Sequence, residues 1–233
     1  SALDGTIVNT ALATIVGELG GLKYYAWVGT AYMLTSTTAT PLFGKLSDLY
    51  GRRRLFQIAI LTFVIGSLIC GLAQSMWQLV VARGIQGVGG GGLFSLSFAI
   101  IGDVVPPRER GRAQGYIAMI SVLASTAGPL VGGVMVEALG WRSLFLVTIP
   151  LAVLAMILLH RAKITRNHAR KARFDIKGFF ALLAMVVGGT SAIELATDTG
   201  LTTAVLVSAA LGLAGFFALF PTQKRAANPL FPP

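Results

Sequence analysis

The stretch Phe43-Gly44-Lys45-Leu46-Ser47-Asp48-Leu49-Tyr50-Gly51-Arg52-Arg53-Arg54-Leu55 places a cluster of cations between two long apolar runs. Residues 25–43 precede it and residues 55–73 follow it. Each run has about 19 residues, enough for a helix to cross about 30 Å of hydrocarbon at about 1.5 Å per residue. Lys and Arg are retained on the cytoplasmic side of membrane proteins. The stretch therefore predicts a cytoplasmic hairpin, residues 44–54, between two membrane-spanning helices.

The composition indicates the same class of protein. Of the 233 residues, 55% are hydrophobic and only 12% are charged, whereas soluble domains average about 25% charged residues. The 28 glycines fit packed membrane helices, because small residues let backbones approach closely. Since Cys70 is the one cysteine, no disulfide can form within the chain. The predicted fold class is an all-α integral membrane protein.

The net charge of +10 is also typical of nucleic-acid-binding proteins, but the distribution of the cations indicates membrane topology. Sixteen of the 19 lysines and arginines fall in alternate loops between the expected spans. These loops are residues 44–54, 106–112, 160–177 and 221–233. Trp27, Trp77 and Trp141 fall at the other ends of the spans, as in an aromatic belt. We predict cytoplasmic loops at 44–54 and 160–177, a lipid bilayer as partner, and no nucleic-acid partner.

The first apolar segment contains the acid Asp4, with Asn9 further along. The apolar pattern is already running at Ala2-Leu3 with no basic flank before it, so we expect the chain to begin inside its first span. An ionisable residue within a span costs a few kcal/mol or more, and is a functional candidate by default. The alternative is that Asp4 lies near the cytoplasmic edge and is simply hydrated.

Arg83 and Gln86 lie in the expected fourth span, about residues 77–105. At about 1.5 Å per residue from Trp77, Arg83 is about 9 Å inside the outer end. A guanidinium keeps its proton in proteins, so a buried one needs backbone carbonyls, a carboxylate or water as partners. It is either a fixed charge beside a proton or substrate path, or a structural hub of hydrogen bonds.

Two glycine-containing stretches follow. Gly87, Gly89 and Gly92 match the spacing of a dinucleotide-binding loop, but they lie within a membrane-length apolar segment with no preceding strand. Close contact between helices is the better interpretation. The second stretch, about residues 128–133, contains Gly128, Pro129, Gly132 and Gly133. A proline removes a backbone donor, so this stretch is either a functional bend or an ordinary packed kink.

Four stretches together resemble motifs of the major facilitator superfamily. The hairpin resembles the signature loop between its second and third helices. Residues 3–12, Leu-Asp-Gly-Thr-Ile-Val-Asn-Thr-Ala-Leu, are similar to the first-helix motif of the fourteen-helix drug:proton antiporter branch. Residues 83–87, Arg-Gly-Ile-Gln-Gly, resemble the fourth-helix motif, and residues 128–133 resemble the fifth-helix antiporter motif. The four motifs occur in the family's order.

The resemblance implies a division of the chain. Residues 1–159 would be the N-terminal six-helix half of a transporter, with its first helix truncated. Residues 160–177 would be a basic cytoplasmic linker, and residues 178–220 the two extra transmembrane helices of the branch. Residues 221–233 would lead to a C-terminal half that is missing from this sequence. That half is then a partner of the chain.

The resemblance also implies roles for individual residues. Proton and substrate coupling would involve Asp4, Asn9, Arg83 and Gln86, with Asp4 loading and releasing the proton. Gating at the cytoplasmic side would involve Gly44, Asp48, Gly51 and Arg52. The bend that favours antiport would involve Gly128, Pro129, Gly132 and Gly133.

The implied function is secondary transport in the plasma membrane, in which amphipathic or cationic compounds are exported against proton entry. The proton would be the coupling ion, with no cofactor and no bound metal. An exporter of one endogenous metabolite or lipid is the alternative on the same fold. A membrane scaffold without transport is the alternative of another class. An enzyme is disfavoured, because the spans contain no nucleophile–base pair or cluster of metal ligands.

Overall fold

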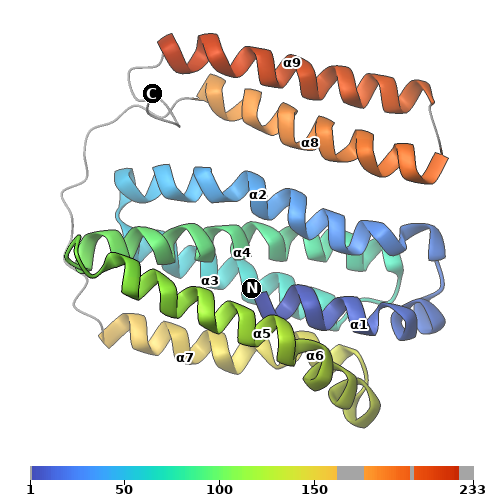
Figure 1. The fold of residues 1–233 in the computed structure, drawn as a ribbon. Helices are drawn as coiled ribbons and strands as arrows, with labels where there is room; N and C mark the ends of the chain where they lie inside the picture. The colour runs from blue at the N-terminus through green and yellow to red at the C-terminus, as the bar shows by residue number, and fades with distance from the viewer. Residues whose placement is uncertain (1, 162–175, 200–201, 226–233) are drawn as a thin grey trace.

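The structure is a computed structural model that describes residues 2–161, 176–199 and 202–225. Helices account for most of these residues (Figure 1). They are α1 (Ala2–Leu19), the 3-10 helix η1 (Leu22–Tyr24), α2 (Tyr25–Tyr50), α3 (Arg52–Gly71), α4 (Met76–Val104), α5 (Arg110–Leu139), α6 (Arg142–Leu146), α7 (Thr148–Arg161), α8 (Ile176–Thr199) and α9 (Thr203–Arg225).

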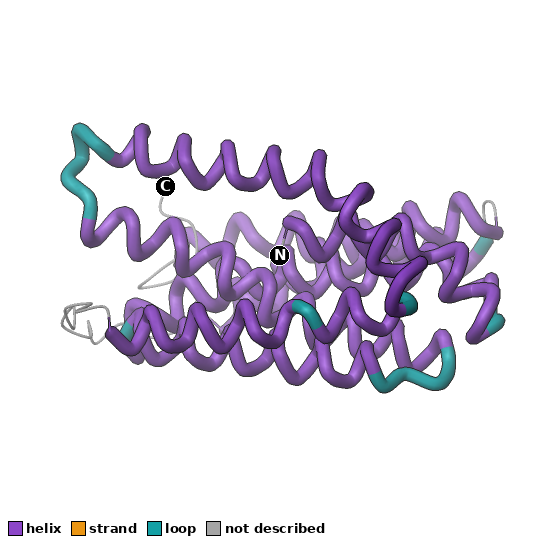
Figure 2. Tube along the Cα trace, turned by 90° about the horizontal axis from the view of Figure 1, so that it is seen from below, coloured by secondary structure: helices purple, strands orange, loops and turns teal. Residues whose placement is uncertain are grey.

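The helices run roughly alongside one another, with their turns at the two ends of the bundle (Figure 2). Helix α4 packs against both α2 and α3, α1 packs against α5, and α3 contacts α6 and α7. Helices α8 and α9 pack mainly against each other, and α8 contacts α2 (Figure 1). We call the end at Gly51, where α2 meets α3, the hairpin end, and the other the opposite end.

The fold class predicted from sequence is confirmed. In the part of the chain that the structure describes, four segments are long and apolar enough to cross a membrane: Arg52–Gly71, Met76–Val104, Arg110–Leu139 and Arg142–Arg161. Shorter apolar stretches occur in α1, α8 and α9. Helix α2 carries a run of hydroxyl side chains at residues 35–38, which lowers its hydropathy. The arrangement of six helices plus two stays a prediction.

The glycine run of α4 confirms the expected close helix contacts. A Cβ atom on Gly89 would lie 2.7 Å from the Cα atom of Phe63 on α3. On the α2 side, a Cβ atom on Gly91 would lie 2.9 Å from the Cα atom of Ser36. A larger residue at either position would push the backbones apart. The run is continuous helix, and it holds α2 and α3 tightly against α4.

The hairpin is more helical than its charge pattern suggests. We expected a short charged segment between spans that end near Phe43 and begin near Leu55, and those boundaries are wrong. Helix α2 continues to Tyr50 and α3 begins at Arg52, so Gly51 alone joins them. Its φ of 93° is a backbone conformation that favours glycine. A single glycine therefore reverses the chain.

The opposite end is closed by contacts that the aromatic-belt prediction does not anticipate. Trp77 is exposed, but the side chain of Trp141 is only 1% exposed, so the belt prediction is wrong for Trp141. Its indole N–H donates to Oε2 of Glu18 at 2.7 Å. Arg142 pairs with the same carboxylate and donates to the carbonyl of Ala73 at 3.3 Å. Together these contacts tie the end of α1 to the start of α6.

Candidate functional site

Arg83 lies deep in the bundle, with a side chain only 1% exposed. Its Nε donates to the carbonyl of Val28 at 3.3 Å, and its guanidinium carbon lies 4.2 Å from the ring centre of Tyr32. Both partners belong to α2, which the glycines of α4 allow to approach. The prediction of a deeply buried guanidinium with hydrogen-bond partners is confirmed, and neutral groups of α2 supply several of its contacts.

Gln86 extends this contact into α3 and α7. The Arg83 Nη1 group donates to Gln86 Oε1 at 2.6 Å, and Gln86 Nε2 donates to Ser67 Oγ at 2.7 Å. The hydroxyl oxygens of Ser67 and Thr148 are 3.0 Å apart. Gln86 and Ser67 are fully buried. We call Arg83, Gln86, Ser67 and Thr148 the core polar chain, which joins α4, α3 and α7.

The structure therefore brings together two of the four residues predicted for coupling, Arg83 and Gln86. The other two, Asp4 and Asn9, belong to α1, but their side chains lie outside the described residues. Their neighbours Ile7 and Val8 are buried, and α1 packs against α5. The coupling roles of Asp4 and Asn9 stay predictions.

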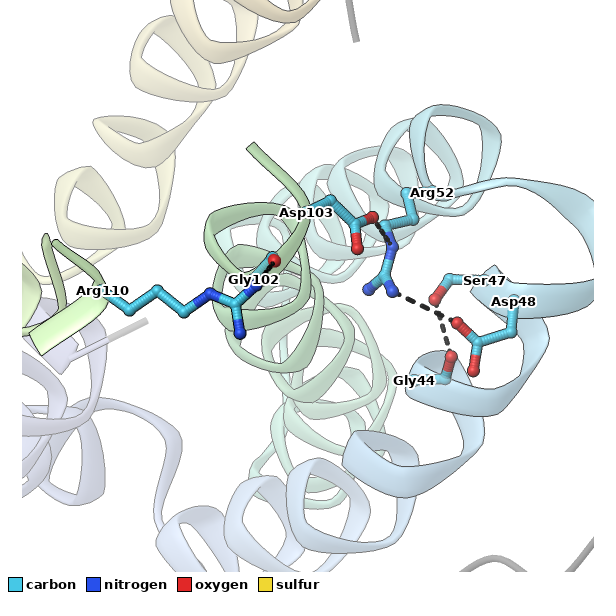
Figure 3. Close-up of polar contacts among 7 residues, drawn as sticks. All are labelled: Gly44, Ser47, Asp48, Arg52, Gly102, Asp103 and Arg110. Carbon is cyan, nitrogen blue, oxygen red and sulfur yellow. Dashed lines mark hydrogen bonds and ion pairs between the residues drawn. The ribbon is translucent and has the colours of Figure 1, made fainter. Parts of the chain in front are cut away.

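Figure 3 shows the hairpin end, where Arg52 lies between two carboxylates. The Arg52 Nη2 atom is 3.3 Å from Oδ1 of Asp48 on α2, and the Arg52 Nε pairs with Oδ2 of Asp103 on α4. The Ser47 hydroxyl donates to the carbonyl of Gly44 at 2.6 Å. A Cβ atom on Gly44 would lie 3.1 Å from Ser95 Oγ. The predicted gating residues thus tie α2, α3 and α4 together.

Asp103 is the residue of this site that sequence reasoning missed. It directly precedes Val104, the last residue of α4, and lies close to Pro106-Pro107, where the apolar segment ends. An acid at this end of a span, on the same side as a cluster of cations, was the available signal. The contact joins residues 51 positions apart, so only the packing of α3 on α4 reveals it.

Other arginines close the same end. Arg110 donates through Nε to the carbonyl of Val105 at 3.1 Å and through Nη2 to the carbonyl of Gly102 at 2.6 Å. Gly102 lies in the last turn of α4 and Val105 directly follows the helix, where helix carbonyls lack intrahelical partners. Arg53 donates to the carbonyl of His160 at 3.1 Å, linking α3 to α7. The cations predicted to mark topology also fasten the helix ends.

The predicted bend lies within α5, which continues through Pro129. Gly128 and Gly132 are buried, whereas Pro129 is exposed. A Cβ atom on Gly132 would lie 3.0 Å from Cγ2 of Ile7 on α1, while one on Gly133 would meet nothing within 4 Å. Gly132 therefore has a packing reason, which is close approach to α1. A role of the four residues in antiport stays a prediction.

A cavity of about 400 Å³ lies between α3, α4, α5 and α7. Its lining is mainly apolar and includes Phe56, Phe63, Phe94, Phe98, Ser121 and Thr148. Thr148 thus belongs both to the cavity wall and to the core polar chain. Among the described residues, no group of three or more His, Cys, Asp or Glu side chains could hold a metal ion.

A bundle with four helices long and apolar enough to cross a membrane, within the residues that the structure describes, indicates a multi-pass membrane protein. The sequence matches the Major Facilitator Superfamily over residues 1–231, and the chain belongs to that family. It is 38% identical to multidrug transporter protein MdtP of Bacillus subtilis (strain 168), over 100% of this chain and 43% of that protein. It is 36% identical to multidrug resistance protein 3 of the same strain, over 99% of this chain and 45% of that protein.

A fungal relative, efflux pump FUS6 of Gibberella fujikuroi, is 34% identical over 94% of this chain and 41% of its own length. The chain thus spans less than half the length of these relatives. The fold is also similar to that of an auto inhibited POT family peptide transporter, with a TM-score of 0.61 and 15% identity. That likeness covers 96% of this chain and 51% of the transporter.

Proposed function

We propose that the complete protein is a proton-coupled antiporter that exports drugs or other amphipathic compounds across the plasma membrane. The observation that carries the proposal is the fully buried Arg83, held in the core polar chain. A guanidinium is expensive to bury in a membrane protein, and such residues mark substrate or proton paths. The names of the bacterial relatives, a multidrug transporter and a multidrug resistance protein, support a drug as substrate.

In this proposal Asp4 carries the proton. A carboxylate whose surroundings change between dry and wet as the protein changes conformation takes up and releases a proton accordingly. Arg83, with Gln86 and Asn9, sets the electrostatic potential at that carboxylate. Asp4 and Arg83 belong to α1 and α4, so coupling would depend on how these two helices face the transport path.

The hairpin end would act as a latch on the cytoplasmic side. Arg52 is held by Asp48 and Asp103, and this cluster would meet a helix of the C-terminal half in one conformation and release it in the other. Alternating access in such transporters is largely a rocking of two halves around a site near the bilayer midplane. Gly128, Pro129, Gly132 and Gly133 would shape α5 to restrict proton leak. Residues 44–54 and 160–177 would then be cytoplasmic.

The partners follow from the same proposal. They are a small amphipathic or cationic substrate, the surrounding lipid and the C-terminal half of the same protein, with no nucleic acid. The protein would be a transporter and not an enzyme, and it would use the proton as coupling ion without a cofactor. Its domains would be residues 1–159, the linker 160–177, the two extra helices 178–220 and the connecting segment 221–233.

Reconstitution of the complete protein into lipid vesicles tests the proposal. With an acidic lumen, protons leave and an antiporter carries a fluorescent lipophilic cation inward. We expect accumulation that disappears when a protonophore collapses the pH gradient. Accumulation that persists after the pH gradient is collapsed would contradict proton coupling. A complete lack of transport of amphipathic cations would contradict drug export.

A further inference from the structure

The hydrogen bonds of the core polar chain are all donated in one direction, and Arg83 sets this direction at one end. A guanidinium has only donors, so the Gln86 atom that faces Arg83 Nη1 at 2.6 Å must be the amide oxygen. This fixes which way the amide is turned. The Gln86 NH₂ group then faces Ser67 Oγ at 2.7 Å, and the serine oxygen accepts.

The far end sets the same direction. The Thr148 hydroxyl donates to the carbonyl of Phe145 at 2.6 Å, and a carbonyl can only accept. Thr148 has a single hydroxyl proton, so it has none left for Ser67 Oγ, 3.0 Å away. The Ser67 hydroxyl therefore donates to Thr148. Donation runs one way, from Arg83 through Gln86, Ser67 and Thr148 to the main chain of α6.

Burial makes each link matter. The exposed fraction is 1% for Arg83 and 0% for Gln86 and Ser67. Bulk water therefore cannot replace a lost hydrogen-bond partner of these side chains. A buried serine in a helix often donates back to a carbonyl of its own preceding turn, which would turn its Oγ toward that turn. Here Thr148 holds the Ser67 hydroxyl toward α7, so its oxygen faces Gln86.

We propose that Ser67 and Thr148 are positioning residues for Arg83. They hold the Gln86 amide in the one orientation that presents its oxygen to the guanidinium. Neither residue belongs to the motifs that suggested the transporter function. The effect on transport rests on the function proposed above, whereas the effect on Gln86 does not.

The Cys70 thiol offers a readout that is independent of transport. Its sulfur donates to the same Gln86 oxygen at 3.8 Å, so the S–H stretching band in the infrared spectrum reports where that oxygen is. The band is measured in the complete protein and assigned by its loss in Cys70→Ala. We expect Ser67→Ala to shift it, and Thr148→Val to shift it less in the same direction.

Two control variants test whether a shift of the S–H band is specific to the hydrogen bonds of the core polar chain. Thr148→Ser keeps the hydroxyl and should leave the band in place. Thr38→Val removes another buried hydroxyl, one that donates to the carbonyl of Leu34 in its own helix at 2.8 Å, and should also leave it in place. An unmoved band in both Ser67→Ala and Thr148→Val would overturn the proposal, and Thr148→Val serves alone if Ser67→Ala does not fold.

Proton-driven efflux is the second measurement that tests the proposal. A neutral hydrogen bond has a net worth of about 0.5–1.5 kcal/mol, so we expect proton-driven efflux to fall roughly two- to tenfold in Ser67→Ala and Thr148→Val. Thr148→Ser should restore it. A shifted band with unchanged efflux would overturn the role of this orientation in transport, and absent transport in the unaltered protein would instead contradict the proposed function.

Discussion

Two arginines of this protein meet their partners in opposite ways. Arg83, about two turns into α4, is 1% exposed and contacts a carbonyl, an amide and an aromatic ring. Arg52, at the hairpin end, has a side chain 18% exposed and sits between two carboxylates that are 50% and 26% exposed. Among the contacts that the structure describes, neutral groups hold the buried cation and opposite charges hold the one at the hairpin end.

The difference shows where each site can be weakened. Charge pairs near solvent are typically worth about 0–1 kcal/mol and are screened by salt. A buried polar network has no solvent to replace a lost partner, so its geometry matters more than its charge. We therefore expect changes in the buried region to cost more than changes at the hairpin end.

The largest effect should come from separating the helices that surround Arg83. In Gly89→Ala, the new methyl would meet the α3 backbone at Phe63, and we expect about 1–3 kcal/mol of destabilisation from overpacking. Gly102→Ala is the matched control on the same helix, since a Cβ there meets nothing within 4 Å. Thermal unfolding of the complete protein should show a lower Tm for the first variant only. Equal Tm values would contradict the close contact between the glycine run of α4 and the backbone of α3.

Arg83→Lys keeps the charge but loses the planar guanidinium, which is not equivalent to an ammonium. We expect proton-driven efflux to fall about tenfold or more, a change of about 1.4 kcal/mol in the barrier. Arg54→Lys, at an exposed position of α3, is the control and should retain activity. Full activity in Arg83→Lys would show that charge alone matters at both arginines.

A double-mutant cycle measures the coupling free energy between Arg52 and Asp103 at the hairpin end. For Arg52→Gln and Asp103→Asn in the complete protein, we expect a coupling free energy of about 1 kcal/mol or less that shrinks as salt is added. The free energy comes from unfolding of the four proteins at two ionic strengths. A salt-independent coupling of several kcal/mol would contradict the distinction between the two regions.

The smallest effect should be that of Asp48→Asn. Its carboxylate is half exposed and lies 3.3 Å from Arg52, so we expect a loss of about 0.5 kcal/mol or less in stability. The measurement is again the unfolding free energy of the complete protein. A larger loss than that of Asp103→Asn would reverse the order of importance of the two acids.

The sequence predicted what is carried by local pattern. Runs of apolar residues predicted the helices α3, α4 and α5, and the spacing of small residues predicted close helix contacts at the glycine run of α4. Asp48 and Arg52 were singled out through the family resemblance, and their ion pair is local because they lie four residues apart; their gating role stays a prediction. In each case the information lies within a short stretch of the sequence.

What the sequence did not predict depends on packing between distant segments. Asp103 meets Arg52, Trp141 meets Glu18 and Thr148 meets Ser67 only after the helices assemble. The hairpin boundaries were also wrong, since charged residues at a span's end were read as loop although they continue α2 and open α3. Polarity marks where a membrane ends better than where a helix ends.

Proton-driven transport by an Asp4→Asn variant of the complete protein tests the central claim most directly. In vesicles, the variant should lose accumulation of a lipophilic cation driven by a pH gradient while still exchanging that cation across the membrane at equal pH. Asn keeps the size of the side chain but cannot release a proton. Accumulation that still follows the pH gradient in Asp4→Asn would contradict the account.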